Sequence, residues 1–144
     1  MPLTDQHRFG MQIAQMSRGW RAELDRRLAG LGLSQARWLV LLHLARFDQA
    51  PTQRELAQSV GVEGPTLARL LDSLETQGLV QRQSVLEDRR AKKIVLCAPA
   101  RPLIEQIETI ANQLRHELFE GVDEADLKIC MQVHGHILAN LEKS

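Results

Sequence analysis

Residues 79–97 have the pattern of two β-strands, in a chain whose other long segments have helical periodicity. LVQRQSV shows partial alternation of apolar and polar residues, and KIVLC is rich in β-branched residues, both of which favour strands. Between them lies the polar stretch LEDRRAK. The sequence therefore predicts a β-hairpin with a charged tip within a mainly helical protein, which excludes a purely helical bundle.

The segment just before the hairpin predicts two short helices joined by a tight turn. Thr52 and Glu55 have the spacing of a capping box, which favours a helix start, and Gly61 suits the left-handed residue at that helix's end. Pro65 fits the first turn of a second helix, which we expect to end at Gly78. This second helix is amphipathic and is expected to bury Leu67, Leu70, Leu71 and Leu74. Two such helices followed by a hairpin are typical of a winged helix-turn-helix.

Long helices are predicted on both sides of this central unit. The first carries an apolar stripe from Phe9 to Leu31, and Ser34 is the expected N-cap of a second, almost wholly apolar helix that we expect to be buried. After Pro99 helical periodicity returns in two apolar series, Leu103, Ile107, Ile110, Leu114 and Leu118, and then Leu127, Met131, His134, Leu138 and Leu141. One small central unit cannot cover all these stripes, so we expect a homodimer whose terminal helices interlock.

The composition is that of a soluble globular protein. At 144 residues the chain suffices for one domain with a hydrophobic core, and 44% hydrophobic and 25% charged residues are ordinary values. No apolar run is long enough to cross a bilayer, and the N-terminus lacks the pattern of a secretory signal. We therefore expect a cytoplasmic protein with no membrane partner.

Catalytic and metal-binding patterns do not stand out in the sequence. Cys97 and Cys130 are far apart and form no C-x-x-C, which argues against a disulfide scaffold and against a zinc site. His134 and His136 would point about 200° apart on a helix, so they cannot bind one metal from a single face. Nucleophile and base motifs, Gly-rich phosphate loops and paired carboxylates are also missing, and we expect no enzyme activity, no metal and no cofactor.

Charge is unevenly distributed along a chain of zero formal net charge. The segment from Arg82 to Lys93 is locally basic, whereas the C-terminal third is rich in Asp and Glu. A neutral protein does not coat nucleic acid through bulk electrostatics, but a local basic patch can still contact it. At the end of a hairpin, arginine side chains can enter the minor groove of A·T-rich DNA beside a recognition helix in the major groove. The alternative for this charged stretch is a solvated hairpin loop.

Several blocks of the sequence resemble the MarR family of bacterial transcription regulators. The most specific is QSVLEDRRAKKIVL, which is similar to the family's wing signature. Within the family, the SlyA branch is the one most similar to LGLSQARWLVL, ELAQSVGVEGPTLARLLDSLETQGLVQRQ and DRRAKKIVL. The resemblance covers nearly the whole chain. It implies a mainly α fold with a small β-wing, as a single MarR-type domain over residues 1–144. A winged helix-turn-helix lobe would occupy 34–97, and a helical dimerisation lobe would be formed by 1–33 and 98–144.

The resemblance also implies which residues contact double-stranded DNA. The recognition helix would face the major groove, and the hairpin arginines would enter the minor groove, with Asp88 holding one of them through a charge-assisted pair. The implied DNA-binding residues are Pro65, Thr66, Arg69, Ser73, Asp88, Arg89, Arg90 and Lys92. For Arg69 the alternative is an ordinary exposed position on a surface helix.

An effector site is implied as well, because in the SlyA branch a small aromatic carboxylate such as salicylate can bind between the two lobes and weaken DNA binding. The residues that match such a site here are Arg18, Arg21 and Trp38. Two guanidinium groups beside an indole suit an aromatic acid, by bidentate pairing and stacking. The alternatives are that Trp38 packs in the core or an interface and that the arginines form inter-subunit salt bridges.

Two other functions are compatible with the sequence pattern. A protein-interaction module would use the winged fold as a scaffold and the long helices as its working surface. A thiol sensor would act through Cys97, which follows Leu96 where the family usually has threonine and lies near a predicted helix N-terminus. For Cys97 the alternative is a small buried residue, and its presence there leaves the start of the following helix open.

Overall fold

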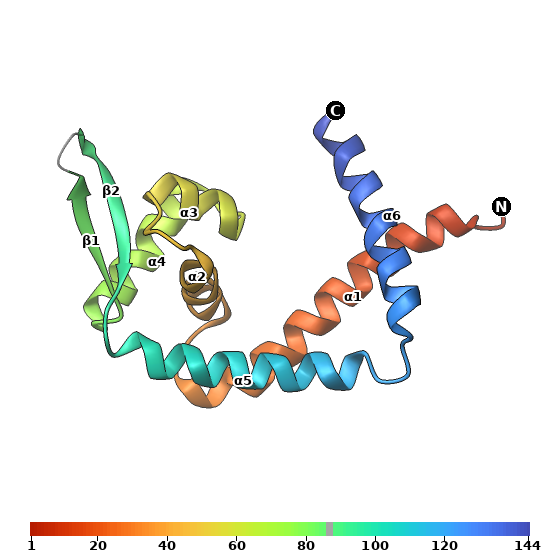
Figure 1. Cartoon of the computed structure of the whole chain (residues 1–144), viewed down its shortest axis with the longest axis horizontal. Helices are drawn as coiled ribbons and strands as arrows, with labels where there is room; N and C mark the ends of the chain where they lie inside the picture. Colours follow the sequence, from red (N-terminus) through yellow and green to blue (C-terminus); the bar gives the residue numbers. More distant parts are fainter. Residues whose placement is uncertain (86–87) are drawn as a thin grey trace. The chain divides into compact units, whose positions relative to one another are not determined.

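The computed structural model describes residues 1–85 and 88–144, with the backbone alone for residues 85 and 88–91. Along these residues the elements follow in the order α1 (Asp5–Leu28), η1 (Ala29–Leu31), α2 (Gln35–Arg46), α3 (Gln53–Val60), α4 (Gly64–Thr76), β1 (Val80–Val85), β2 (Asp88–Leu96), α5 (Ala100–Leu118) and α6 (Glu124–Glu142) (Figure 1). The described chain is thus mainly helical with a small two-stranded antiparallel sheet, which confirms the predicted fold class.

The chain divides into two compact units, Met1–Asn112 and Gln113–Ser144. The first contains the helix-turn-helix and the hairpin, and the second contains α6. The predicted lobes, 34–97 and the two chain ends, stay a prediction, because they are a functional division that compactness alone does not test.

Side-chain caps mark where α2 and α3 begin. The Thr52 hydroxyl accepts a hydrogen bond from Glu55 N (3.1 Å), and the Glu55 carboxylate accepts one from Thr52 N (3.0 Å), so the predicted capping box starts α3. The hydrogen bond from Thr52 N to the carboxylate, followed by hydrogen bonding with the Thr52 side chain, lowers the pKa of Glu55. Gly61 ends α3 at φ 84°, a left-handed conformation that favours glycine, and Pro65 lies in the first turn of α4. Ser34 likewise caps α2, so these predictions are confirmed.

Three leucines anchor α4 in the hydrophobic core. Leu67, Leu71 and Leu74 have 0% exposure. Fully buried side chains also come from α2, α3, the sheet and α5: Trp38, Val40, Leu41, Leu56, Val80, Ile94 and Ile107. Leu70, predicted to be buried with the other leucines of α4, is only half-buried, because it lies at the edge of their stripe.

The long helices differ in detail from the predicted stripes. α1 ends at Leu28, and Leu31 belongs to the short 3-10 helix η1, which ends at the left-handed Gly32. On α5 the buried residues are Ala100, Ile104, Ile107, Ala111 and Leu114 rather than the whole series from Leu103 to Leu118. The two series lie on neighbouring faces of one helix, and the small Ala111, which the prediction left out, completes the buried one.

The wing is a two-stranded antiparallel hairpin (Figure 1). β1 and β2 pair from Val80 opposite Leu96 to Ser84 opposite Lys92, and the register then shifts before the strands reach Asp88. The predicted second strand began after Lys92, with Asp88 in a polar tip; that boundary is wrong, because β2 begins at Asp88. Charged residues do not prevent strand pairing, since the ladder is formed by backbone groups. Residues 88–92 of the predicted polar tip therefore belong to β2.

A bridge joins the base of the wing to the start of α3. Ile94 N donates to Pro51 O at 2.9 Å, and the next residue, Thr52, pairs with Lys93. Thr52 is also the N-cap of α3, so one residue belongs to both the bridge and the helix-turn-helix. The wing is thereby fixed to the helix that precedes α4.

Both terminal helices carry exposed apolar side chains. α1 exposes Phe9, Met11, Ile13 and Met16, and α6, which has no buried residue, exposes Ile129, Met131, Val133, Ile137, Leu138 and Leu141. No single helix in the described residues is long and apolar enough to cross a membrane. The pair Asp5–Leu31 and Gln35–Arg46, bent by 94°, meets that test of length and composition only when taken together.

Candidate nucleic-acid interface

α4 presents a polar face away from its buried leucines. Pro65 and Arg69 are exposed, and Thr66 and Ser73 are half-buried. With about 100° between successive residues, all four lie on the side of α4 that faces away from the leucine stripe. A recognition helix needs this arrangement, in which one face is anchored in the core and another can approach base edges.

Ser73 is held from inside the first unit. Arg37 Nη1 donates to Ser73 Oγ at 3.0 Å, and Arg37 Nε donates to Ser34 Oγ at 3.1 Å. Arg37 thus ties the N-cap of α2 to α4. The Ser73 oxygen already accepts this bond while its own proton is still available to donate, and its contact with DNA stays a prediction.

The wing places Lys92 at an exposed position of β2. Asp88, Arg89 and Arg90 belong to β2 by their backbone, whereas their side chains, and Glu87 altogether, lie outside the described part of the chain. The minor-groove roles assigned to these residues therefore stay predictions.

Arg82 on β1 makes a polar cluster that the sequence analysis missed. Its Nη1 lies 2.7 Å from Asp72 Oδ1 and 3.5 Å from Glu75 Oε1. Its Nη2 donates to Ala68 O at 2.8 Å, and its backbone N donates to Glu75 Oε2 at 3.1 Å. From sequence, Arg82 counted only as one basic residue of the wing, whereas its charge is matched by two carboxylates of α4. The sequence does contain a signal for this cluster. Asp72 and Glu75 are three residues apart on an amphipathic helix, and Arg82 follows shortly after the turn at Gly78.

The residues of the predicted aromatic-acid site lie on two helices. Arg18 and Arg21 are exposed on α1. Trp38 on α2 is 1% exposed, and its Nε1 donates to Asp25 Oδ1 at 3.4 Å. The indole is thus packed in the core with its faces covered, and the ligand role of the three residues stays a prediction.

His43 connects α2 to α3 and was not singled out from the sequence. Its Nδ1 lies 2.8 Å from Ser59 Oγ. Burial, followed by the positive charges of Arg46 and Arg21, holds the pKa of His43 below its usual value. At pH 7 the imidazole is therefore mostly neutral, and the bond between the two helices is an uncharged one.

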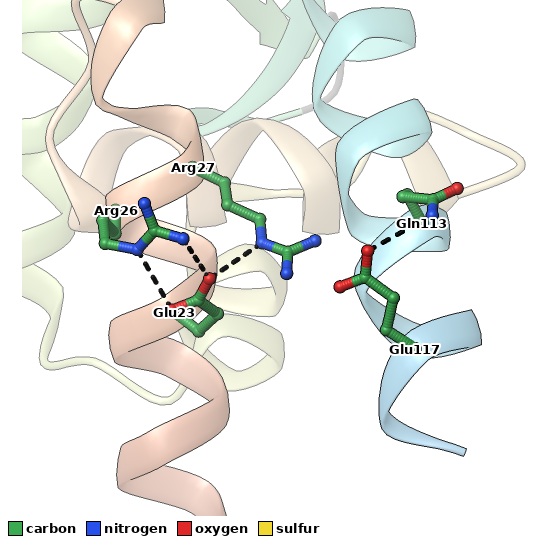
Figure 2. Close-up of polar contacts among 5 residues, drawn as sticks. All are labelled: Glu23, Arg26, Arg27, Gln113 and Glu117. Carbon is green, nitrogen blue, oxygen red and sulfur yellow. Dashed lines mark hydrogen bonds and ion pairs between the residues drawn. The ribbon is translucent and has the colours of Figure 1, made fainter. Parts of the chain in front are cut away.

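Glu23 on α1 and Gln113 on α5 make polar contacts within their own helices (Figure 2). Glu23 accepts hydrogen bonds from Arg26 Nε (3.1 Å) and Arg27 Nε (2.9 Å), and these bonds lower its pKa to about 2. Gln113 Nε2 donates to Glu117 Oε1 at 3.3 Å. Pairs at these spacings support the helices that carry them.

The helix-turn-helix and wing of this chain resemble those of a known protein family. A model with the description MarR family matches residues 31–91, which hold α2, α3, α4 and β1. The solved structure of the transcriptional regulator PA3341 shares 66% sequence identity with a TM-score of 0.89, over 94% of this chain and 99% of that one. The chain belongs to the MarR family.

Two more distant solved structures share the fold of this MarR family protein. One is the S. aureus MepR–DNA complex, with 23% identity and a TM-score of 0.81 over 96% of this chain and 99% of that one. The other is CouR from Rhodococcus jostii RHA1 bound to p-coumaroyl-CoA, with 22% identity and a TM-score of 0.79 over 90% of each chain.

Membership of the MarR family confirms the predicted family and, with the regulator at 66% identity, the predicted class of transcription regulators on a winged-helix fold. The family and the relative at 66% identity are transcriptional regulators rather than enzymes. Within the described residues, no group of three or more His, Cys, Asp or Glu side chains is placed to hold a metal ion. The SlyA branch of the family stays a prediction.

Proposed function

We propose that this MarR family protein acts in the cytoplasm, where it binds a specific inverted-repeat operator as a homodimer and regulates transcription from it. The observation that carries this proposal is the division of α4, whose three leucines are buried at 0% exposure while Arg69 is exposed on another face. We assign base recognition to Arg69, with Pro65 and Thr66 beside it. Phosphate contacts supply most of the affinity in such complexes, and base contacts most of the specificity.

The wing supplies the second DNA contact in this proposal. Lys92 and Lys93 are exposed on β2, and Arg89 and Arg90 precede them in the sequence. The two arginines enter the minor groove next to the major groove that α4 occupies, with Asp88 pairing to one of them. Four cations in one short segment of a neutral chain make binding steeply dependent on salt concentration.

Exposed apolar side chains on the terminal helices support the homodimer. α6 has no buried residue, and Met131, Leu138 and Leu141, which share one face of the helix, are all exposed. A continuous apolar helix face is stabilised when a second chain covers it. A twofold dimer places two recognition helices in successive major grooves, so half-site centres are expected roughly 10 base pairs apart.

The test of this function is a selection of bound sequences from a random duplex pool at two salt concentrations. It uses the wild-type protein, an Arg69→Ala variant, and Arg8→Ala as the charge-matched control, because Arg8 is an exposed arginine on α1. We expect the wild type and Arg8→Ala to enrich the same inverted repeat, and Arg69→Ala to lose base preference at one position in each half-site. No enrichment by a folded wild-type dimer would contradict the proposal and would favour a protein-interaction module.

Release of DNA by a small aromatic carboxylate belongs to the same proposal. The exposed guanidinium groups of Arg18 and Arg21 support the acid-binding half of such a site. Because Trp38 is 1% exposed, its stacking on a ligand needs a local movement of α1 or α2. Salicylate should release DNA from the wild type and not from an Arg18→Ala, Arg21→Ala double variant. Equal release from both proteins would remove these residues from the effector site.

A thiol sensor is the remaining alternative. Cys97 is half-buried just before α5, and its backbone N donates to Leu79 O at 2.9 Å. Peroxide-dependent loss of DNA binding that disappears in Cys97→Ser would establish this alternative. Equal peroxide responses of the wild type and Cys97→Ser would exclude it.

A further inference from the structure

Arg82 lies where the wing meets the recognition helix. Its guanidinium spans Ala68 O (2.8 Å), Asp72 Oδ1 (2.7 Å) and Glu75 Oε1 (3.5 Å), and its backbone N donates to Glu75 Oε2 (3.1 Å). The Arg82 side chain is 16% exposed, against 68% for Asp72 and 42% for Glu75. The arginine is therefore enclosed against α4, and its polar contacts connect strand β1 to that helix.

The partners of Arg82 form a stripe of their own along α4. Ala68, Asp72 and Glu75 have the i, i+4, i+7 spacing of one helix face. At about 100° per residue, this stripe lies roughly 100° around the helix from the buried leucines and roughly 100° from the face that carries Arg69. α4 thus has three faces, which contact the core, Arg82 and solvent.

This contact fixes the orientation of α4 in a way that the core cannot. Apolar packing is non-directional, whereas a planar guanidinium donates along fixed directions and so specifies geometry. The carbonyl of Ala68, to which Arg82 donates, belongs to the same peptide group as the backbone N of Arg69. Arg82 therefore holds the backbone at the residue to which we assign base recognition.

We propose that Arg82 is a positioning residue that couples the wing to α4, so that the two engage DNA as one unit. This inference rests on the proposed DNA-binding function and deepens it. Arg82 does not contact DNA itself, because its guanidinium is turned to α4. Without the Arg82 contact, the wing would be held only at its base, by the bridge to Pro51 and Thr52, and the strand that carries Arg82 would have to be ordered against α4 during binding. The entropy cost of that ordering would reduce the wing's contribution to affinity.

Whether Arg82 holds the wing against α4 is tested in the protein without DNA, by amide hydrogen exchange of β1 and β2. The proteins are the wild type, Arg82→Ala, Arg82→Lys and the Arg8→Ala control. Lysine keeps the charge but has a single nitrogen where Arg82 uses two, Nη1 for Asp72 and Nη2 for Ala68 O, so it does not reproduce both contacts in this geometry. We expect wing amides to exchange about tenfold faster or more in both Arg82 variants, with the exchange of α3 unchanged. Wild-type exchange rates of the wing in Arg82→Ala or in Arg82→Lys would overturn the proposal, whether or not the protein binds DNA.

The coupling to DNA is tested by a double-mutant cycle between Arg82→Ala and an Arg89→Ala, Arg90→Ala wing variant, on the duplex that the wild type selects. With Kd corrected for the folded fraction, we expect the wing variant to weaken binding at least about fivefold in the wild-type background and less than about twofold in the Arg82→Ala background. Equal fold-changes in the two backgrounds would overturn the coupling. If the wild-type protein prefers no duplex, the proposed function and the coupling to DNA are both refuted. The hydrogen-exchange rates would still show whether Arg82 holds the wing against α4.

Discussion

Replacing Leu71 by alanine tests whether the buried and exposed faces of α4 have separate roles. Leu71 has 0% exposure in the core. The substitution removes three carbon atoms, and at about 0.8 kcal/mol for each the lost transfer free energy is roughly 2.4 kcal/mol. The cavity left behind adds about 24 cal/mol per Å³ of its volume, which brings the expected loss in the free energy of unfolding to about 3 to 5 kcal/mol.

Urea unfolding at a fixed protein concentration measures this loss. With a slope of about 2 kcal/mol per M, the midpoint should fall by roughly 2 M. The matched control is Arg69→Ala on the same helix, because Arg69 is exposed and its removal should change the free energy of unfolding by less than about 0.5 kcal/mol. The effects on DNA affinity per folded molecule should be the opposite. Arg69→Ala should lose about 1 to 3 kcal/mol of binding free energy, and Leu71→Ala should bind DNA about as tightly as the wild type.

Two results would refute this separation of the faces. A loss of less than about 1 kcal/mol in Leu71→Ala would show that the leucine stripe does not anchor α4. Unchanged DNA affinity in Arg69→Ala, with a stability loss comparable to that of Leu71→Ala, would show that Arg69 supports the fold instead of recognising DNA.

Three further outcomes are expected. Thr52→Ala removes the N-cap of α3 and should lower the free energy of unfolding by about 1 kcal/mol in urea, with Thr52→Ser close to wild type. Gly61→Ala forces a β-carbon into φ 84° and should cost about 1 to 2 kcal/mol, whereas Gly10→Ala inside α1 should not destabilise the protein. The pKa of His43 is lower in the folded than in the unfolded chain, so the unfolded state binds more protons below pH about 6.5, and the free energy of unfolding should fall as the pH drops from 7. If the free energy of unfolding of a His43→Gln variant falls with pH as much as that of the wild type, the pH dependence comes from another group.

Local signals in the sequence predicted the helix boundaries of the helix-turn-helix. Ser34, Thr52, Gly61 and Pro65 act on groups within a few residues of themselves, so their roles could be worked out without knowledge of the fold. The start of β2 at Asp88 was misplaced, because it depends on the backbone groups that β1 offers and no apolar alternation marks that stretch. The buried face of α5 was partly misplaced for a similar reason, since several adjacent apolar residues allow more than one stripe.

The sequence predicted those residues of the candidate interface whose position depends only on their own helix. Amphipathic spacing alone puts Arg69 on the face of α4 away from the core. Arg82 contacts α4 only because the chain folds β1 back against that helix. From the sequence alone, it could only be counted among the basic residues of the wing. Ser73 accepts a hydrogen bond from Arg37, which lies 36 positions earlier in the chain, and no local pattern links the two.

The fixed base of the wing lets its outer end change in length independently. The bond from Ile94 N to Pro51 O sets the base, so a residue inserted just before Thr52 would disturb the sheet and α3 together. A residue pair inserted beyond Ser84 and Lys92 would leave the register below it intact and extend the hairpin by about 3.4 Å. That step is about the rise of one DNA base pair. Because one added pair also turns the side chains beyond it to the opposite faces of the hairpin, an insertion that keeps those side chains facing as before needs two pairs, which span roughly two base pairs.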